Sequence, residues 1–122
     1  MIYAFLSKLI PNEIKQEVDA SSVGYMQDAA NTLQWHIYNG LCENLNNEIK
    51  LFNVLPIGSF PQYYKKLFIK GSLFETVYSK TNLNIGFCNL KGIRRLLLPK
   101  CVFKALESWA RNKEEKTLFV YT

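Results

Sequence analysis

The sequence predicts an α/β fold, with a twisted, mainly parallel sheet and helices on both faces. Three observations carry this prediction. A β-branched and aromatic run near the N-terminus precedes a segment with apolar residues at helical spacing, and a second apolar run follows that segment. The same alternation returns near the C-terminus. Because parallel neighbours need a long crossover, this succession favours βαβ units over hairpins. We expect a Rossmann-like sheet in which the strands, numbered in chain order, lie side by side in the order 3-2-1-4.

The first βαβ unit spans roughly the first half of the chain. Residues 2–6 predict a buried strand, and the polar residues 11–22 predict a connecting loop. Residues 25–45 predict a helix, because apolar side chains recur on one stripe. That stripe consists of Met26, Ala30, Leu33, Ile37 and Leu41. Residues 49–55 predict the second strand, and the turn residues Pro56-Ile57-Gly58 close it.

The second half repeats the pattern with one ambiguous stretch. Residues 84–88 predict a third strand, and Pro99 is typical of the first position of a helix. The core stripe of that helix would be Val102, Leu106 and Trp109. Residues 116–121 predict the fourth strand. Between residues 62 and 82 a hairpin is favoured by the alternation over residues 67–74, although a helical turn also fits.

Composition places the chain among single globular domains. Its 122 residues are 48% hydrophobic and 14% aromatic, enough for one core, and no apolar run approaches the length of a membrane span. The N-terminus lacks signal-peptide features. The three cysteines, Cys42, Cys88 and Cys101, form no CxxC pair, which indicates reduced thiols and a cytoplasmic location. The only histidine, His36, lies in the first predicted helix, so neither a Cys–His pair nor a metal site is expected.

The net charge of +5 is partly local. One group of lysines lies among aromatic residues near Tyr64, and a second basic group spans residues 91–104. A solvated basic face is the plainer interpretation, and contact with an anionic membrane surface is the alternative. No nucleic-acid motif accompanies the charge, so nucleic acid is not an expected partner.

The candidate site follows from the predicted topology. Ligands of open parallel sheets bind at the carboxyl ends of strands and at the helix N-termini that face them. The residues at these places are Ser22, Gly24, Tyr25, Gln27, Gly58 and Ser59. Two interpretations of Gly24 stay open, a turn into the helix or a close approach to a ligand. For Ser22 a capping role competes with ligand contact. Neither GxxxxGK[ST] nor GxGxxG occurs, so no nucleotide cofactor is expected.

The order of these segments resembles the N-terminal half of GT-B glycosyltransferases, of the retaining family-4 kind. The matching positions are Gly24, residues 25–31, Gly40 and residues 49–58. A bacterial subgroup is matched further by Leu9-Ile10-Pro11, by Pro56-Ile57-Gly58-Ser59-Phe60-Pro61 and by Asn84-Ile85-Gly86-Phe87. The family's usual glycine pair is Val23-Gly24 here.

The resemblance implies an incomplete, acceptor-side domain over residues 1–122. Transfer of a sugar from a nucleotide-sugar to an acceptor sugar or glycolipid would then require a second, donor-binding domain. The isolated chain is expected to be inactive and to need no cofactor. Two other classes of function remain open, a stand-alone ligand- or protein-binding module and a basic adaptor at the inner face of the cell membrane.

Two features predict contacts beyond the sheet. Trp35 lies opposite the apolar stripe of its helix, so we expect the connection over residues 11–22 or a partner to cover it. The fourth strand contains uncharged residues over 118–121 and would form an open sheet edge, which natural proteins usually protect. We therefore expect a homodimer that pairs through this strand.

Overall fold

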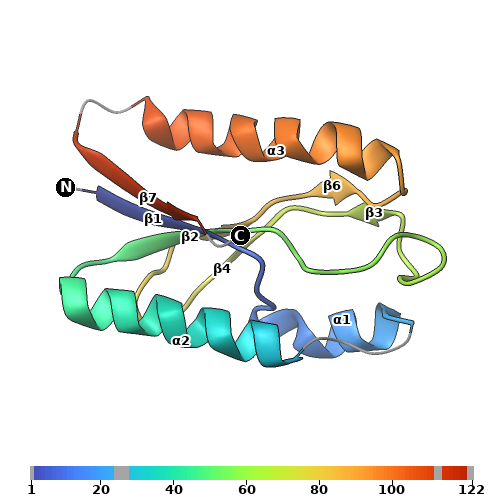
Figure 1. Ribbon diagram of the computed structural model, residues 1–122, viewed down its shortest axis with the longest axis horizontal. Helices are drawn as coiled ribbons and strands as arrows, with labels where there is room; N and C mark the ends of the chain where they lie inside the picture. Colours follow the sequence, from blue (N-terminus) through green and yellow to red (C-terminus); the bar gives the residue numbers. More distant parts are fainter. Residues whose placement is uncertain (1, 24–27, 112–113, 121–122) are drawn as a thin grey trace.

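The computed structural model describes residues 2–23, 28–111 and 114–120, and its described part is a mixed α/β fold. A central sheet lies between helix α3 on one face and helices α1 and α2 on the other (Figure 1). The predicted fold class, α/β with helices on both faces of a mainly parallel sheet, is confirmed at this level.

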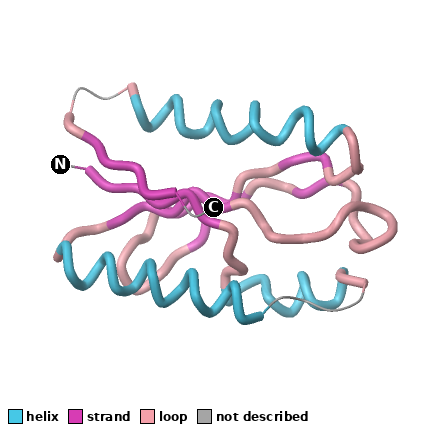
Figure 2. The backbone as a smooth tube through the Cα atoms, in the orientation of Figure 1, coloured by secondary structure: helices cyan, strands magenta, loops and turns pink. Residues whose placement is uncertain are grey.

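The main sheet has five strands in the order β4-β5-β2-β1-β7. Their bounds are β1 Ile2–Ser7, β2 Ile49–Asn53, β4 Ser72–Phe74, β5 Asn82–Asn84 and β7 Lys116–Val120. Strand β1 pairs in parallel with β2 and β7, β2 pairs in parallel with β5, and β4 adds an antiparallel edge. A second, two-stranded sheet joins β3 (Phe68–Ile69) to β6 (Phe87–Cys88), seen beyond the main sheet in Figure 2.

Residues 11–22 are not the expected loop. They form a short 3-10 helix, η1 (Asn12–Ile14), and then helix α1 (Lys15–Ser21). Pro11 precedes η1 with an extended conformation, and Val18 is buried in the core. The polar composition hid a helix because only one side of α1 is buried, and Lys15 and Asp19 form an ion pair on its exposed side.

The strand expected at residues 84–88 is split into β5 and β6, which are separated by Ile85 and Gly86. A Cβ atom added at Gly86 would lie 2.6 Å from the main-chain nitrogen of Gly71, so two backbones approach closely here. The expected strands within residues 67–74 exist, but they do not form one hairpin. Strand β3 pairs with β6 and β4 pairs with β5, because the chain changes sheets at the two glycines.

Helix α3 spans Ile93–Ala110 and contains Pro99 in its interior, so Pro99 does not open the helix as expected. A proline there removes one main-chain hydrogen bond. Side chains on both sides of Pro99, including Leu98 and Val102, pack against the core. This shared packing keeps the helix continuous across the proline, which propensity alone does not anticipate.

Helix α2 (Asp28–Leu45) also buries a different face from the one expected. Leu33 is exposed, whereas Gln34, Tyr38 and Cys42 are buried. The Gln34 side chain bonds both main-chain groups of Lys8, and the Tyr38 hydroxyl donates to the Ile49 carbonyl oxygen at 2.9 Å. Polar groups satisfied in this way can lie in a core. Ile37 and Leu41 of the expected stripe do pack against that core, so the stripe was right in part and the buried face is turned from it toward Gln34 and Tyr38. Of that stripe, Met26 lies outside the described residues.

Two core layers hold the helices to the sheet. Between the sheet and α3, Phe52 and Trp109 meet edge to face with ring centroids 6.0 Å apart. Between the sheet and α2, Phe5 and Tyr38 meet in the same way at 6.4 Å. Such pairs add to the hydrophobic burial and set the position of each helix over the sheet. The carboxyl ends of β1 and β2 are thereby placed beside the N-terminal half of α3.

Candidate functional site

A cavity of about 1070 Å³ lies between α3 and the carboxyl ends of β1 and β2. Leu6, Ser7 and Lys8 line it at the end of β1, and Val54 lines it just after β2. Its remaining walls come from Ser59, from residues at the start and middle of α3, and from Val120 of β7. The cavity therefore occupies the sheet edge at which open α/β proteins bind ligands.

The cavity combines positive charge with apolar walls. Its four cations are Lys8, Lys91, Arg94 and Arg95, and no Asp or Glu is found among the described residues that line it. Its apolar lining comes mainly from α3 and includes Leu98, Pro99, Val102, Phe103 and Leu106. Cations attract phosphate and carboxylate groups, and the apolar wall favours a hydrocarbon portion. The chemistry suits a ligand with an anionic group and an apolar part.

Arg94 is the most constrained of the four cations. Its Nη1 atom donates to the Ile57 carbonyl oxygen at 2.5 Å and to Asn89 Oδ1 at 3.2 Å. The guanidinium lies 5.4 Å from the centroid of the Phe87 ring. Burial lowers the pKa of this guanidinium, although an arginine stays charged in proteins. Arg94 is thus a half-buried cation held by neutral acceptors, with further donors free to bind an anion.

Asn89 connects the arginine to the loop after β2. This side chain is fully buried, and its Nδ2 atom donates to the Gly58 carbonyl oxygen at 2.8 Å. Its main-chain oxygen accepts from the Phe60 amide at 2.9 Å. Since Asn89 holds both Arg94 and the loop over residues 58–60, the cation and Ser59 are positioned together.

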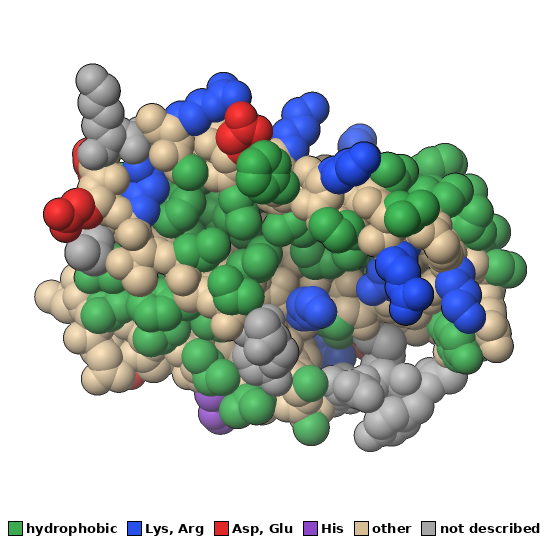
Figure 3. Space-filling view, turned by 45° about the horizontal axis from the view of Figure 1, so that its top comes forward, with side chains coloured by type: hydrophobic (Ala, Val, Ile, Leu, Met, Phe, Trp, Pro, Cys, Tyr) green, Lys and Arg blue, Asp and Glu red, His purple; other side chains and the backbone are tan. Residues whose placement is uncertain are grey.

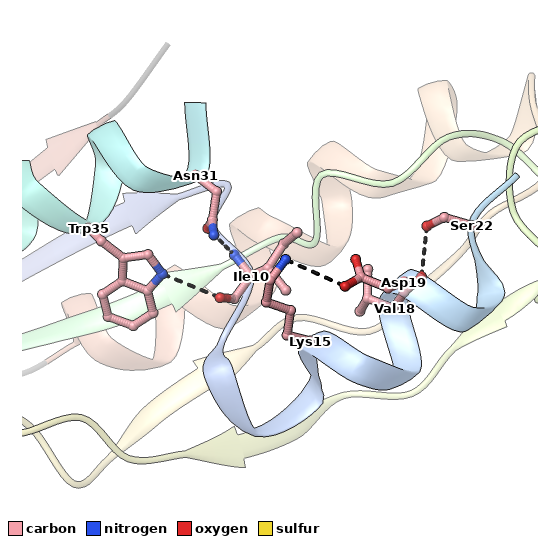
Figure 4. Close-up of polar contacts among 7 residues, drawn as sticks. All are labelled: Ile10, Lys15, Val18, Asp19, Ser22, Asn31 and Trp35. Atoms are coloured by element: carbon pink, nitrogen blue, oxygen red, sulfur yellow. Dashed lines mark hydrogen bonds and ion pairs between the residues drawn. The ribbon is translucent and has the colours of Figure 1, made fainter. Parts of the chain in front are cut away.

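The structure places the predicted site residues in three different situations. Ser59 lines the cavity, and Gly58 supplies a carbonyl oxygen to Asn89. Ser22 does not line it; this residue caps the C-terminal end of α1, and its hydroxyl donates to the Val18 carbonyl oxygen at 2.7 Å (Figure 4). For Ser22 the capping interpretation is the one the contacts support. Gly24, Tyr25 and Gln27 lie outside the described residues.

Trp35 is covered by the segment that follows β1. Its Nε1 atom donates to the Ile10 carbonyl oxygen at 3.3 Å, and Asn31 Oδ1 accepts from the Ile10 amide at 2.7 Å (Figure 4). Its indole also meets the Tyr38 ring edge to face. These contacts fasten the end of β1 to α2 and so fix the chain next to Lys8. Trp35 is therefore covered by Ile10, which lies just before residues 11–22, the connection that we expected to cover it.

Sequence patterns did not identify Lys8 as a site residue and did not place it beside Arg94 and Arg95. The basic group over residues 91–104 was visible in the sequence, but a helix expected to begin at Pro99 left the two arginines in a loop. Because α3 begins at Ile93, the arginines occupy its first turn and face the strand ends. An N-terminal strand followed by a lysine was the one signal that could have identified Lys8.

The described part of the chain shows no arrangement of residues for metal binding or for catalysis by a cysteine thiolate. No group of three or more His, Cys, Asp or Glu residues there could hold a metal ion. Cys42 is buried, and burial raises the pKa of its thiol, the opposite of what a thiolate nucleophile requires. His36 is exposed on α2. No described helix combines the length and the hydropathy needed to cross a bilayer.

Comparisons of the chain with family models, with curated proteins and with solved structures give no match. The fold and the cavity by themselves define the class of protein: an α/β domain with a cationic, apolar-walled cavity at the carboxyl edge of its sheet.

Proposed function

We propose that this chain is a ligand-binding domain that holds an anionic, partly apolar molecule in the cavity. The observation that carries the proposal is the gathering of four cations at the strand ends, with no carboxylate among the described lining residues. Four like charges in one cavity repel one another, and this cost is offset when an anion binds between them. The apolar wall along α3 would cover the hydrocarbon part of the same ligand.

In this proposal the ligand is the acceptor of a GT-B glycosyltransferase, and the chain is a Rossmann-like acceptor-side domain. Two observations support it besides the sequence resemblance: the parallel strands β5-β2-β1-β7 and the position of Ser59 in the cavity. A glycolipid with a phosphate group fits the lining best. The nucleotide-sugar would bind a separate domain, so the chain alone transfers nothing. The alternative, a stand-alone binding module, uses the same cavity, and continuation of the reading frame into a second such domain would distinguish the two.

Dodecyl phosphate is a suitable probe, because it joins an anionic head to an apolar chain. We expect calorimetry below its micellar concentration to show binding that neither inorganic phosphate nor neutral dodecyl maltoside matches. Arg94→Gln should weaken that binding about tenfold or more, as expected for the loss of a charge-assisted hydrogen bond. Lys8→Gln tests the same site without disturbing a structural contact of the kind Arg94 makes, since Lys8 bonds Gln34 through its main chain.

The matched control is Lys70→Gln, which removes an exposed lysine outside the cavity lining. This variant should bind dodecyl phosphate as the unchanged chain does. Equal affinity of the unchanged chain, Arg94→Gln and Lys8→Gln would contradict the proposal. So would equal binding of dodecyl phosphate and the neutral detergent.

The proposal includes a homodimer that forms through β7. This strand ends the main sheet on the side away from β4, and its Val120 side chain is 52% exposed. Two copies related by a two-fold axis could pair their β7 strands antiparallel into one continuous sheet. Val120→Lys should block that pairing and leave only monomer in sedimentation at tens of micromolar.

Because Val120 also lines the cavity, Leu118→Lys is the companion variant, and its position lies outside that lining. The control is Val77→Lys, which adds the same charge at a side chain that is 96% exposed and lies far along the chain from β7. Dimers that persist in both β7 variants, or a monomer in the unchanged chain, would refute pairing through this strand.

A further inference from the structure

The positive charge of the chain is concentrated on α3 and its two ends. Residues 91–111 contain six Lys or Arg and one Glu, a net charge of +5 that equals the net charge of the whole chain. The rest of the chain therefore carries no net charge. Arg94 points inward and Arg111 pairs with Glu107 at 2.8 Å. The other four cations of this segment, Lys91, Arg95, Lys100 and Lys104, are exposed and form no ion pair with a described residue.

Large apolar side chains lie exposed among these cations. Leu96 is 71% exposed and Phe103 is 68% exposed, and they lie seven residues apart, so they share one side of the helix. No described side chain of α3 is fully buried. Figure 3 turns the top of Figure 1, where α3 lies, toward the reader, and Lys and Arg side chains there lie among hydrophobic ones. The outer face of α3 is thus both cationic and apolar.

This combination identifies what could cover the face. A second copy of the chain would bring the same positive charge against it, and like charges oppose that contact. A nucleic acid would neutralise the lysines but would leave Leu96 and Phe103 without an apolar environment. An anionic lipid bilayer satisfies both, because its headgroups attract the lysines while its acyl boundary accepts the leucine and the phenylalanine.

We infer that α3 is an interfacial helix that docks the protein on an anionic membrane surface. The helix lies along the surface, with Leu96 and Phe103 inserted among the lipids and with Lys100 and Lys104 at the headgroups. Its 18 residues give a contact about 27 Å long. Arg95, Pro99 and Phe103 also line the cavity, so docking would place the cavity opening beside the lipid headgroups. The inference itself does not depend on which ligand the cavity binds.

Co-sedimentation with vesicles tests the inference. The vesicles are phosphatidylcholine alone, or phosphatidylcholine with about 30% phosphatidylglycerol as the anionic lipid. We expect binding to the anionic vesicles only, and its loss in about 0.5 M sodium chloride, where surface charges are screened. Lys100→Gln combined with Lys104→Gln should lower the partition coefficient about 30-fold, because each lysine near the surface contributes roughly a factor of five.

Leu96→Gln should also weaken the partition, about tenfold, and this exposed position leaves the core unchanged. The matched controls are Lys70→Gln combined with Lys80→Gln, and Val77→Gln; all three are exposed positions outside α3. Neither control should change vesicle binding. Leu96, Lys100 and Lys104 lie outside the cavity lining, so their variants should bind dodecyl phosphate as the unchanged chain does, and a failure of the proposed cavity ligand and a failure of docking would give different results.

Three results would overturn docking through α3. The first is equal binding to neutral and anionic vesicles. The second is a control that loses as much binding as the α3 variants do while all of them keep their helical circular dichroism. The third is retention of RNA that depends on Lys100 and Lys104 but is unaffected by Leu96→Gln, together with absent vesicle binding, which would assign the face to nucleic acid.

Discussion

Asn53→Asp is expected to lower the free energy of unfolding by about 3–5 kcal/mol, because it breaks a fully satisfied buried amide. Asn53 lies at the end of β2 and is completely buried. Its Oδ1 atom accepts from Ser7 Oγ and from the Leu9 amide, both at 2.8 Å. Its Nδ2 atom donates to the Leu9 carbonyl oxygen and to Asn84 Oδ1, also at 2.8 Å. This one side chain therefore ties the ends of β1, β2 and β5 together.

The aspartate has nearly the same shape but no donor. Its second oxygen would face the Leu9 carbonyl oxygen, leaving that acceptor unsatisfied and placing a charge where water is excluded. Burial would raise the pKa of the new carboxyl above its unfolded value of about 3.9. A group with a raised folded pKa is stabilising when protonated, so the deficit should shrink as the pH falls toward about 4 and grow as the pH rises through the folded pKa.

Urea unfolding followed by circular dichroism measures this effect. The matched control is Asn12→Asp, which makes the same chemical change at an exposed position and should stay within about 0.5 kcal/mol of the unchanged chain. A loss below about 1 kcal/mol for Asn53→Asp, or a loss independent of pH, would show that the amide does not bridge the three strands as described.

Gly58→Ala is the second large effect, with an expected loss of about 2–3 kcal/mol from overpacking. A Cβ atom at Gly58 would lie 2.2 Å from Tyr63 Cβ. Because Tyr63 Cβ is attached directly to the main chain, rotation of the ring cannot relieve that contact. The Tyr63 amide also donates to the Ser59 carbonyl oxygen at 2.9 Å, which holds the loop in place. The loop must therefore move, and Ser59 moves with it at the cavity.

The matched control is Gly40→Ala inside α2, where an added Cβ would meet nothing within 4 Å. Alanine there should stabilise the helix by about 0.5–1 kcal/mol, so the two alanine variants should shift urea unfolding in opposite directions. If Gly58→Ala unfolds at the same urea concentration as the unchanged chain, the close packing of this loop against Tyr63 is wrong.

The two predictions concern residues that sequence reasoning treated unequally. Gly58 was expected at a ligand edge, and the structure gives it a packing role beside that edge. Asn53 was read only as part of an apolar strand. A buried asparagine looks polar in any local window, and its contribution to stability depends on four hydrogen bonds to three residues that lie 31 to 46 positions away in the chain. No local pattern could identify them.

The sequence by itself determined the class of fold. Alternating apolar runs and helical spacing specify β1, α2, β2 and β7 almost to their ends, because local hydrophobic periodicity decides which backbone geometry can bury a face. It also showed that positive charge gathers over residues 91–104. Both are properties of short windows.

Tertiary structure decided the rest. It continued α3 through Pro99, turned Gln34 and Tyr38 inward instead of Leu33, and split residues 84–88 between two sheets. In each case long-range packing or hydrogen bonding outweighed a local preference of about 1–3 kcal/mol. The cavity follows from the same cause. Lys8 and Arg94 lie 86 positions apart in sequence, and only the packing of α3 over the ends of β1 and β2 brings them to one site.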